Sequence, residues 1–460
     1  MVDSPGGSGF EAVDARQAVA RRRADVLARL DGPALVPAGE APPRNYRANR
    51  YAFRASSHFL HLVGAPLPGA CLLLDGEATL FVPSPGPDDA LWHGPTPGPT
   101  ELAERLGLPV RPLEALDAAL GGRCAATVAA PDAETRAWQA RRPRDAEADA
   151  QLADVLIDSR LVHDALAQRG LREAAEATVA AHLAGMRHTA PGRREWAVRA
   201  EMEAELARRG MGTAYGSIVS VHGEVLHNEH HDGVLAAGDL LLADVGAETR
   251  GGYAGDVTRT WPVSGRFSPT QRAVYDVVLA AQAAAIERVA PGVRYRDVHL
   301  AAARRLTEGL VDLGVLRGDV DGLVEDDVHA LFFPHGIGHL LGLDVHDMED
   351  LGDRAGYAAG RTRSTRFGLG YLRLDRDLVA GMAVTIEPGF YQVPALLQDA
   401  DRTRRAGDRL VRTALARFAD VRGIRIEDDV LVTAHGHEVL TRALPADAAA
   451  VEAEVGRCVG

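Results

Sequence analysis

The chain has 460 residues, 46% of them hydrophobic and 25% charged, a length that suits two domains and a composition typical of soluble globular proteins. Its formal net charge of −13 argues against nucleic-acid binding, which requires a basic face. No apolar run approaches the roughly eighteen residues of a membrane span, and the N-terminal segment lacks the apolar core of a secretory signal. Three widely spaced cysteines, Cys71, Cys124 and Cys458, suggest no disulfide framework, so we expect a cytoplasmic protein.

The N-terminal region reads as a small domain of mixed structure. Helical periodicity opens it at residues 11–30. Between residues 51 and 83, three apolar segments broken by Gly and Pro predict short strands: YAFRASSHFLHLVG, ACLLLDG and EATLFVPS. Proline-rich turns follow at 84–99, after which helix and strand signals alternate. We therefore predict an α/β domain over residues 1–160.

The rest of the chain predicts a second, larger domain. Residues 165–210 are rich in Ala, Glu and Arg at helical spacing and predict two helices separated by a Pro-Gly pair. Strand-like segments dominate beyond them, interrupted by amphipathic helices at about 270–290 and 296–314. This arrangement predicts an α+β domain over residues 161–445. The acidic, alanine-rich tail at 446–460 is expected to fray.

Four carboxylates interrupt apolar, strand-like runs of the second domain: Asp244 in LLLADVG, Asp256 in YAGDVTRTW, Glu387 in VTIEPGFY and Glu427 in IRIEDDVLV. Any one alone could be a paired core charge or face solvent on an edge strand. Four carboxylates that lie close together cannot all be ionised unless cations compensate their charge. With the histidine-rich segment FFPHGIGHLLGLDVHD at 332–347, they indicate a site for two divalent metals. Mostly oxygen ligands with one imidazole favour Mn²⁺, Co²⁺ or Fe²⁺.

These motifs resemble those of the pita-bread metallopeptidases, which comprise Xaa-Pro aminopeptidases and Xaa-Pro dipeptidases. The elements DVG, GDVTRTW, HGIGHLLGLDVHD, TIEPGFY and RIEDD follow the family order within residues 160–440, and a weaker similarity to the aminopeptidase P N-terminal domain precedes them. The resemblance implies a pita-bread catalytic domain that hydrolyses the bond between an N-terminal residue and proline, through a dinuclear metal centre and a bridging hydroxide. It also implies two Mn²⁺ ions per subunit, with Co²⁺ or another divalent ion as substitute, and a homo-oligomer, dimer or tetramer.

Carried over position by position, the resemblance implies five metal ligands. Asp244 would bind one metal, whereas Asp256 and Glu427 would bridge both. His339 and Glu387 would hold the second metal, and Glu387 would also receive a proton from the bridging water. His339 would then be the one metal ligand among the three histidines of its segment.

The same resemblance implies roles for residues around the ligands. His346 would hydrogen-bond the scissile peptide, and His227 and His335 would line the proline pocket. Arg425 and Tyr391 are similar to residues that orient the bridging carboxylates, as expected around any such centre.

Two further features bear on assembly and on access to the site. Trp92 in ALWHGP reads either as a packing residue or, by resemblance, as a tryptophan that reaches into a neighbouring subunit's active site. The segments 351–380 and 393–421 are longer than in compact relatives, and the second has the amphipathicity of helices that cover or flank the site. Asp244 and Asp256 are twelve positions apart, and the doubled glycine between them suggests a long hairpin turn.

Three functions stay open. YAFRASSHFLHLVG and LWHG favour an aminopeptidase acting on peptides with proline in the second position. An aspartate that would meet the substrate amine is absent near residues 47–49, where Ala48 and Asn49 lie, which keeps an Xaa-Pro dipeptidase as the alternative. A non-catalytic pita-bread binding protein is a remote third reading, because such relatives lose ligand carboxylates and this chain retains all five ligands.

Overall fold

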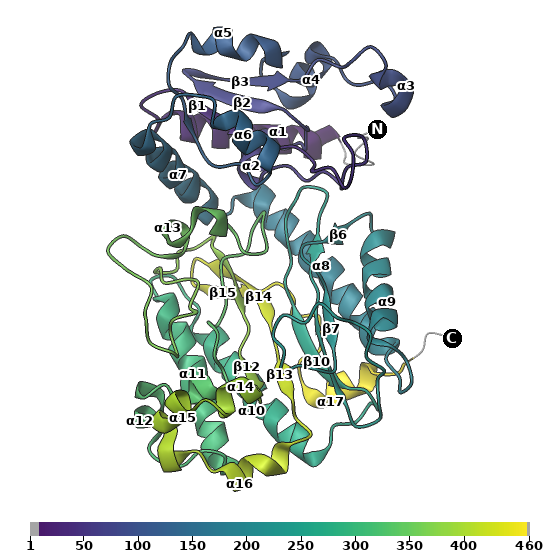
Figure 1. Ribbon diagram of the computed structural model, residues 1–460, viewed down its shortest axis with the longest axis vertical. Coiled ribbons are helices and arrows are strands. Elements are labelled where there is room, and N and C mark those ends of the chain that lie inside the picture. Colours follow the sequence, from purple (N-terminus) through teal and green to yellow (C-terminus); the bar gives the residue numbers. More distant parts are fainter. Residues whose placement is uncertain (1–8, 458–460) are drawn as a thin grey trace. The chain divides into compact units, whose positions relative to one another are not determined.

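The computed structural model describes residues 9–457 and divides into two compact units, Met1–Leu166 and Ala167–Gly460 (Figure 1). Within the described residues, no helix combines the length and the apolarity needed to cross a membrane. Each unit has its own sheets and its own buried core, so each is described by itself.

The N-terminal unit is built on a mixed sheet of five strands in the order β4-β3-β2-β1-β5. Its centre is antiparallel, and the short edge strands β4 and β5 pair in parallel with their neighbours. The strands are β1 (Ala34–Pro37), β2 (Cys71–Asp75), β3 (Glu77–Val82), β4 (Val110–Pro112) and β5 (Ala126–Thr127). The strands predicted from ACLLLDG and EATLFVPS are therefore confirmed.

Helices cover both faces of this sheet, which is why the central strands are apolar at successive positions. On one face Leu35, Cys71 and Phe81 pack against Leu116 and Leu120 of α5. On the other, α2 contacts β1 and β2 (Figure 1). The helices are α1 (Gly9–Leu27), α2 (Ser57–Val63), α3 (Asp89–His93), α4 (Pro99–Leu106), α5 (Leu116–Leu120), α6 (Ala133–Gln139) and α7 (Ala146–Leu161).

The prediction of a strand for the segment YAFRASSHFLHLVG is wrong. Its second half is the helix α2, ended by Gly64 in the left-handed conformation with φ 74°. All seven residues of α2 are buried, so neither the two-residue period of a strand nor the one-sided period of a surface helix is visible. A short apolar run of this kind does not distinguish a buried helix from a strand.

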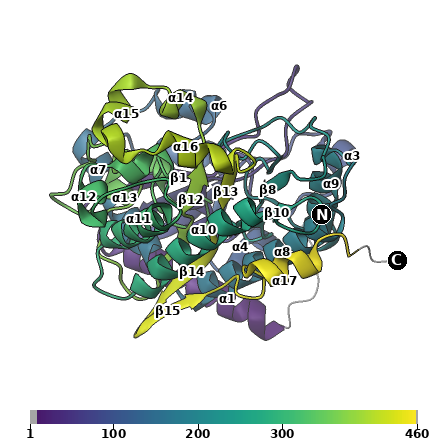
Figure 2. The same cartoon turned by 90° about the horizontal axis from the view of Figure 1, so that it is seen from below.

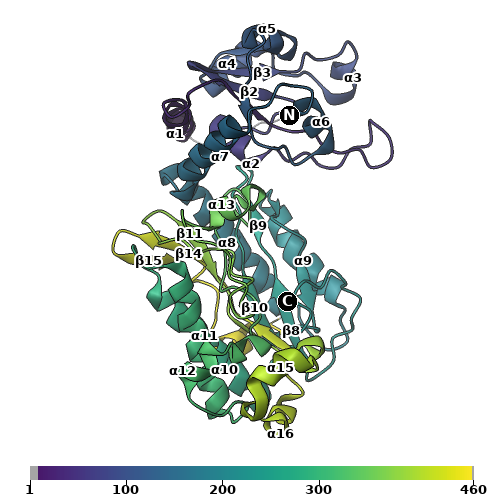
Figure 3. The ribbon, with the colours of Figure 1, turned by 60° about the vertical axis from the view of Figure 1, so that its left-hand side comes forward.

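The C-terminal unit, as we call residues 167–460, is built from four small antiparallel sheets. Two three-stranded sheets have the orders β10-β8-β7 and β11-β14-β15, and two pairs join β12 with β13 and β6 with β9. The strands are β6 (Gly212–Thr213), β7 (Ile218–Ser220), β8 (Leu240–Asp244), β9 (Ala247–Glu248), β10 (Thr258–Pro262), β11 (Ala383–Ile386), β12 (Gly389–Tyr391), β13 (Gly423–Arg425), β14 (Asp428–Thr433) and β15 (Gly436–Val439). The strands lie between α8 and α9 on one side and α10 and α11 on the other (Figures 1 and 3).

The four long predicted helices of this unit are confirmed. The helix α10 begins at a capping box, in which Ser268 and Gln271 each bind the other's backbone amide, with Pro269 in the first turn. The helices are α8 (Ala165–Arg187), α9 (Glu195–Arg208), α10 (Pro269–Arg288), α11 (Tyr295–Asp312), α12 (Val320–Glu325), α13 (Asp353–Gly356), α14 (Pro394–Leu397), α15 (Ala400–Ala406), α16 (Arg412–Leu415) and α17 (Ala448–Glu454).

The tail does not fray where the structure describes it. Residues 448–454 form α17, which contacts α10 and β10 and buries Ala448 and Val451 (Figure 2). Asp447 caps this helix by accepting hydrogen bonds from two backbone amides. The apolar face within an alanine-rich sequence outweighs its acidic charge, and of this tail residues 458–460 lie outside the described residues.

Backbone pairing sets the strands that carry the candidate site in register. In the β8–β10 hairpin Asp244 lies opposite Thr258, and the turn between the strands contains Gly252 with φ 86°. The predicted long hairpin turn is thereby confirmed. The backbone amide of Glu427 donates to the Thr258 carbonyl at 3.0 Å, which ties the start of β14 to β10. The two sheets are thus joined at the point where their carboxylates emerge.

Candidate active site

A cavity of about 370 Å³ in the C-terminal unit gathers the predicted polar side chains. Asp244 is the last residue of β8 and Asp256 lies just before β10, while Glu387 directly follows β11 and Glu427 directly precedes β14. We call these four carboxylates the strand wall. Because strand ends held by backbone pairing are rigid, the four groups are presented to one space from fixed positions. His339 lines the same cavity.

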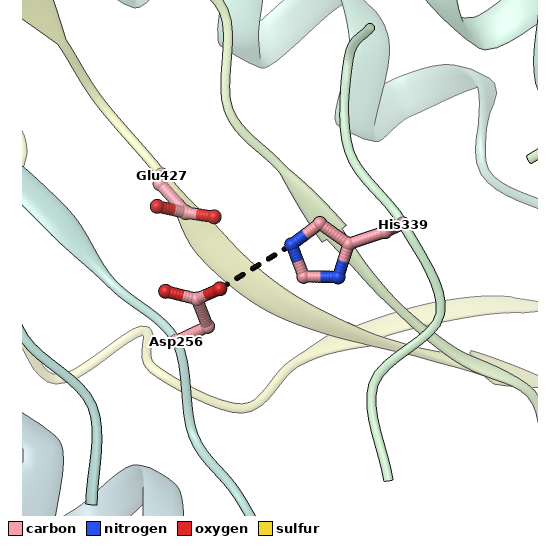
Figure 4. A group of neighbouring side chains, drawn as sticks. All are labelled: Asp256, His339 and Glu427. Carbon is pink, nitrogen blue, oxygen red and sulfur yellow. Dashed lines mark ion pairs between the residues drawn. The ribbon is translucent and has the colours of Figure 1, made fainter. Parts of the chain in front are cut away.

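The tightest part of this cluster is formed by Asp256, His339 and Glu427 (Figure 4). Each offers one ligand atom, and the three atoms lie within 4.8 Å of one another. Nε2 of His339 is 3.3 Å from Oδ2 of Asp256 and 3.8 Å from Oε1 of Glu387. A buried set of carboxylate oxygens and one imidazole nitrogen has the donor chemistry of a divalent-cation site.

Asp244 is held on both of its oxygens by groups from other elements. Its Oδ1 lies 2.5 Å from the Tyr215 hydroxyl, and its Oδ2 accepts a hydrogen bond from Nη2 of Arg425 at 2.5 Å. The same hydroxyl lies 2.5 Å from Oδ1 of Asp256, and its single proton serves one carboxylate at a time. Sequence reasoning missed Tyr215, whose one signal is its place at the start of the strand-like segment YGSIVSV.

The strand wall is short of positive charge. Burial, reinforced by neighbouring carboxylates, raises the pKa of Asp244 to about 6 and that of Glu387 to about 7, and it raises the pKa of Glu427 well above its usual range. Arg425 opposes each of these shifts without cancelling it. The residues present therefore fit divalent cations, which would neutralise charge that the protein itself leaves unbalanced.

The pKa shifts of Asp256 and His339 favour the charged form of each group, because the two side chains face each other. Burial raises the pKa of Asp256, but the hydrogen bond and charge of His339, together with the hydrogen bond of Tyr215, outweigh burial and lower it. Burial lowers the pKa of His339, but the carboxylate of Asp256 outweighs burial and raises it. The contact between His339 and Asp256 thus lies where a metal cation would separate the two ligands, and metal ligation requires a neutral imidazole.

A chain of hydrogen bonds links the strand wall to the rest of the cavity. Thr258 donates to Oε2 of Glu427 at 2.7 Å and accepts from Nε of Arg425 at 2.8 Å. Nη1 of Arg425 donates to the Tyr391 hydroxyl at 3.2 Å, and that hydroxyl lies 2.9 Å from Nε2 of His335. Arg425 lines the cavity and Tyr391 lies behind its lining. Contacts of this kind fix the orientation of ligands in metal sites.

The remaining histidines singled out by the sequence also line the cavity. His335 lies with Nδ1 3.7 Å from Oε2 of Glu387, and burial, aided by the charge of Arg425, lowers its pKa to about 3. Burial also lowers the pKa of His227. The His346 ring meets the His339 ring edge-on, with centroids 4.2 Å apart. Neutral imidazoles beside Leu226 make this part of the cavity suitable for an apolar ring.

A second part of the lining comes from the segment 351–380, whose role the sequence left open. Arg363, Tyr371 and Arg373 line the cavity, and we call these three residues the loop wall. No residue of 393–421 is in the lining. Helix α15 instead lines a neighbouring hollow that shares Tyr371 with the cavity, so the segment 393–421 flanks the site rather than lining it.

Trp92 lies on α3 in the N-terminal unit, with 75% of its surface exposed. Leu91 beside it is 76% exposed, and no residue of α3 is buried. The packing reading of Trp92 is therefore wrong within this chain, because a packing tryptophan would be largely covered.

Antiparallel strand pairs that present four carboxylates and a histidine to one cavity define a metal-dependent hydrolase of the pita-bread class. Comparisons with known proteins agree. The family model "Metallopeptidase family M24" matches residues 169–434, and the model "Aminopeptidase P, N-terminal domain" matches residues 19–130. The chain belongs to metallopeptidase family M24, within its aminopeptidase P branch. The family and fold predicted from the sequence are confirmed.

Individual relatives extend over the whole chain. Xaa-Pro aminopeptidase 2 of Streptomyces coelicolor is 35% identical over 96% of this chain and 91% of its own length, and the Xaa-Pro aminopeptidase of Haemophilus influenzae is 31% identical over 94% and 95%. Among solved structures, aminopeptidase PepP of Pseudomonas aeruginosa matches with a TM-score of 0.79 at 32% identity, covering 95% of this chain and 97% of its own. Zinc-substituted aminopeptidase P of E. coli in complex with product matches with a TM-score of 0.78 at 27% identity, covering 95% and 98%.

Proposed function

We propose that the protein is an Xaa-Pro aminopeptidase, a hydrolase that releases the N-terminal residue from peptides with proline in the second position. The observation that carries this conclusion is the strand wall with His339, in a chain matched along its whole length by proteins of that name. The remote reading of a non-catalytic binding protein is disfavoured, because each of the five candidate ligands is present and lines the one cavity.

Asp244, Asp256, His339, Glu387 and Glu427 would hold two divalent metal ions. Their charge supports this number: four carboxylates and the guanidinium of Arg425 leave three negative charges, and two divalent ions with one hydroxide would bring three positive ones. Asp256 and Glu427 would bridge the ions, as the family resemblance implies. Mn²⁺ is the proposed physiological ion, because oxygen ligands dominate the set.

When bound, the metals would polarise the scissile carbonyl and activate a water at neutral pH. The chain's own residues handle protons and position the substrate. Glu387, whose two oxygens face His339 and His335, is placed to receive the proton of the attacking water and to pass it to the leaving proline nitrogen. Arg425 and Tyr215 hold the carboxylate of Asp244, so that the ligand set stays aligned through the reaction.

Three histidines form the proposed substrate pocket. His227 and His335 are the residues proposed to face the proline ring. Burial lowers the pKa of both imidazoles, which keeps them neutral, and the apolar side chain of Leu226 lines the same cavity. His346, whose ring packs edge-on against the His339 ring and lines the same cavity, hydrogen-bonds the scissile peptide. Proline suits such a dedicated site, since it has no N–H and a fixed φ, which makes it a poor substrate for general peptidases.

We extend the proposal to assembly and location. The protein forms a homo-oligomer in which the exposed Trp92 of one subunit meets the active site of another, which would cover two large apolar side chains, Leu91 and Trp92. Light scattering on the wild type and on Trp92→Ala tests this, and a monomeric wild type would contradict it. The thiols Cys71 and Cys124 are free, which supports placement in the reducing cytoplasm.

The decisive experiment compares Xaa-Pro dipeptides with Xaa-Pro-Yaa tripeptides, using protein loaded with Mn²⁺. The proposal expects release of the first residue from the tripeptides. Cleavage of dipeptides alone would identify the protein as an Xaa-Pro dipeptidase. This is the second candidate function, and the absence of an aspartate near residues 47–49 favours it. No cleavage of either peptide would refute the peptidase reading.

A further inference from the structure

Each histidine of the segment 332–347 has a different partner for its Nδ1 atom. Nδ1 of His335 lies 2.8 Å from the Gly336 carbonyl, and Nδ1 of His339 lies 3.0 Å from the Leu340 carbonyl. These are neighbouring backbone atoms, so any sequence that takes this turn provides them. Nδ1 of His346 instead faces a side chain, Oε2 of Glu349, at 3.4 Å. The orientation of His346 therefore depends on a residue that substitution can remove.

A tight backbone turn brings Glu349 back towards His346. Met348 between them has φ 60°, in the left-handed region that a non-glycine residue seldom adopts, and its side chain is buried. The amide of Glu349 donates to the carbonyl of His346 at 3.3 Å, and the short helix η3 (Glu349–Leu351) follows. A strained residue held between two polar groups at a cavity edge is a feature that surrounding structure must maintain.

Glu349 is itself anchored by the loop wall. Nη1 of Arg373 donates to the same Oε2 atom of Glu349 at 2.6 Å. The charges of His346 and Arg373 outweigh the effect of burial and lower the pKa of Glu349 to about 2, so it is a carboxylate at any working pH. One oxygen thus receives a guanidinium on one side and faces an imidazole on the other. A carboxylate behind an imidazole fixes both ring orientation and tautomer in many catalytic sites.

We propose that Glu349, anchored by Arg373, is a positioning residue that holds the imidazole of His346 in place to meet the scissile peptide. The Nδ1 side of the His346 ring faces Oε2 of Glu349 at 3.4 Å, which leaves the Nε2 side of the ring for the substrate. Among the described residues, no hydrogen bond or ion pair joins Glu349 to the strand wall or to His339, so its contribution is made through His346. This inference rests on the proposed function, because it gives His346 a substrate to meet.

The competing reading is that Glu349 and Arg373 form an ordinary surface ion pair. Their side chains are 37% and 38% exposed, and such pairs contribute roughly 0–1 kcal/mol to stability. A surface pair would leave kcat unchanged, whereas a positioning residue lowers kcat without changing metal content or fold. The two readings are therefore separated by kinetics and by the coupling between Glu349 and His346.

The test is a double-mutant cycle of Glu349→Ala and His346→Ala on the Mn²⁺-loaded enzyme with an Xaa-Pro-Yaa tripeptide. Glu349→Ala is expected to lower kcat about tenfold with less than a twofold change in KM, since orientation of a proton-handling imidazole affects the transition state. In the His346→Ala background the same change should lower kcat less than about twofold. Glu349→Gln, which keeps the shape of the side chain, should fall between the wild type and Glu349→Ala.

Asp377→Asn is the matched control, because Asp377 lies in the segment 351–380 with Arg373, pairs with Arg361 and lies outside the cavity lining. Its kcat should equal that of the wild type. Wild-type kcat in both Glu349 variants, or effects of Glu349→Ala and His346→Ala that multiply, would overturn the positioning role while leaving the proposed function intact. A wild type that cleaves no Xaa-Pro peptide would instead remove the proposed function, and this inference with it.

Discussion

The two walls of the cavity are built in contrasting ways. The strand wall consists of carboxylates at the ends of paired strands, where backbone hydrogen bonds such as that from Glu427 to Thr258 set their positions. The loop wall consists of Arg363, Tyr371 and Arg373 in a segment with little regular structure, and its two arginines are held by the carboxylates of Asp353 and Glu349. The carboxylates proposed to hold the metals therefore lie at rigid strand ends. The loop-wall residues proposed to surround the substrate are held by side-chain ion pairs instead.

The largest expected effect comes from breaking the strand wall. Asp256→Ala should lose about two equivalents of metal and at least a thousandfold in kcat/KM, because a bridging carboxylate contributes to both ions. Elemental analysis and peptide hydrolysis measure the two quantities. Asp375→Asn is the control, since Asp375 is a buried carboxylate paired with Arg294 outside the cavity, and this variant should keep both metals. Equal metal content in Asp256→Ala and the wild type would remove Asp256 from the bridge.

A smaller effect is expected from the hydroxyl that supports the strand wall. Tyr215→Phe should weaken metal binding about tenfold while retaining two sites, because it removes a hydrogen bond to a ligand and leaves the ligand itself. Competition with a chelator measures the affinity. Tyr275→Phe loses a comparable buried hydroxyl, bonded to the Ala446 carbonyl, and should bind metal like the wild type. If both variants behave alike, Tyr215 has no special role in the metal site.

Buried histidines packed against the loop segment should make the stability of the protein sensitive to acid. His299 of α11 donates through Nε2 to the Gly368 carbonyl of the loop segment, and burial lowers its pKa to about 4. His329, whose ring nitrogens have no hydrogen-bond partner among residues 9–457, has its pKa lowered by burial to about 3. Both stay neutral when folded but take up protons when unfolded at pH below about 6.5, so stability is full above that pH and falls as the pH drops.

Between pH 7 and pH 5 each of these histidines should reduce the free energy of unfolding by about 2 kcal/mol. Urea unfolding at both pH values measures the change. His329→Phe removes one of the two buried bases and should lose less stability on acidification than the wild type. An identical loss in both proteins would show that His329 does not contribute.

The smallest effect is expected from a single arginine of the loop wall. Arg363→Gln should raise KM about fivefold with little change in kcat, since a half-exposed charge contributes roughly 1 kcal/mol to substrate contacts. Steady-state kinetics on a tripeptide measures both constants. Arg361→Gln is the control, because Arg361 pairs with Asp377 outside the cavity and should leave KM unchanged. A larger effect on kcat than on KM would place Arg363 nearer the chemistry than this account does.

The same contrast explains what the sequence could predict. The strand wall was predictable because each carboxylate interrupts an apolar run, which is an anomaly visible in one dimension. Tyr215 and Glu349 were missed, because their importance lies in contacts with Asp256 and Arg373 that only the fold creates. The buried helix α2 was misread as a strand, since burial on every side removes the periodicity that distinguishes the two.

The central claim is that the strand wall and His339 hold two divalent ions in one cavity. Calorimetric titration of Mn²⁺ into chelator-treated protein tests it most directly, with hydrolysis of an Xaa-Pro-Yaa tripeptide followed at each step. The account predicts that two equivalents bind per subunit in the wild type, that activity returns as they fill, and that Asp256→Ala binds neither tightly. Saturation at one equivalent with full activity, or unchanged binding in Asp256→Ala, would contradict it.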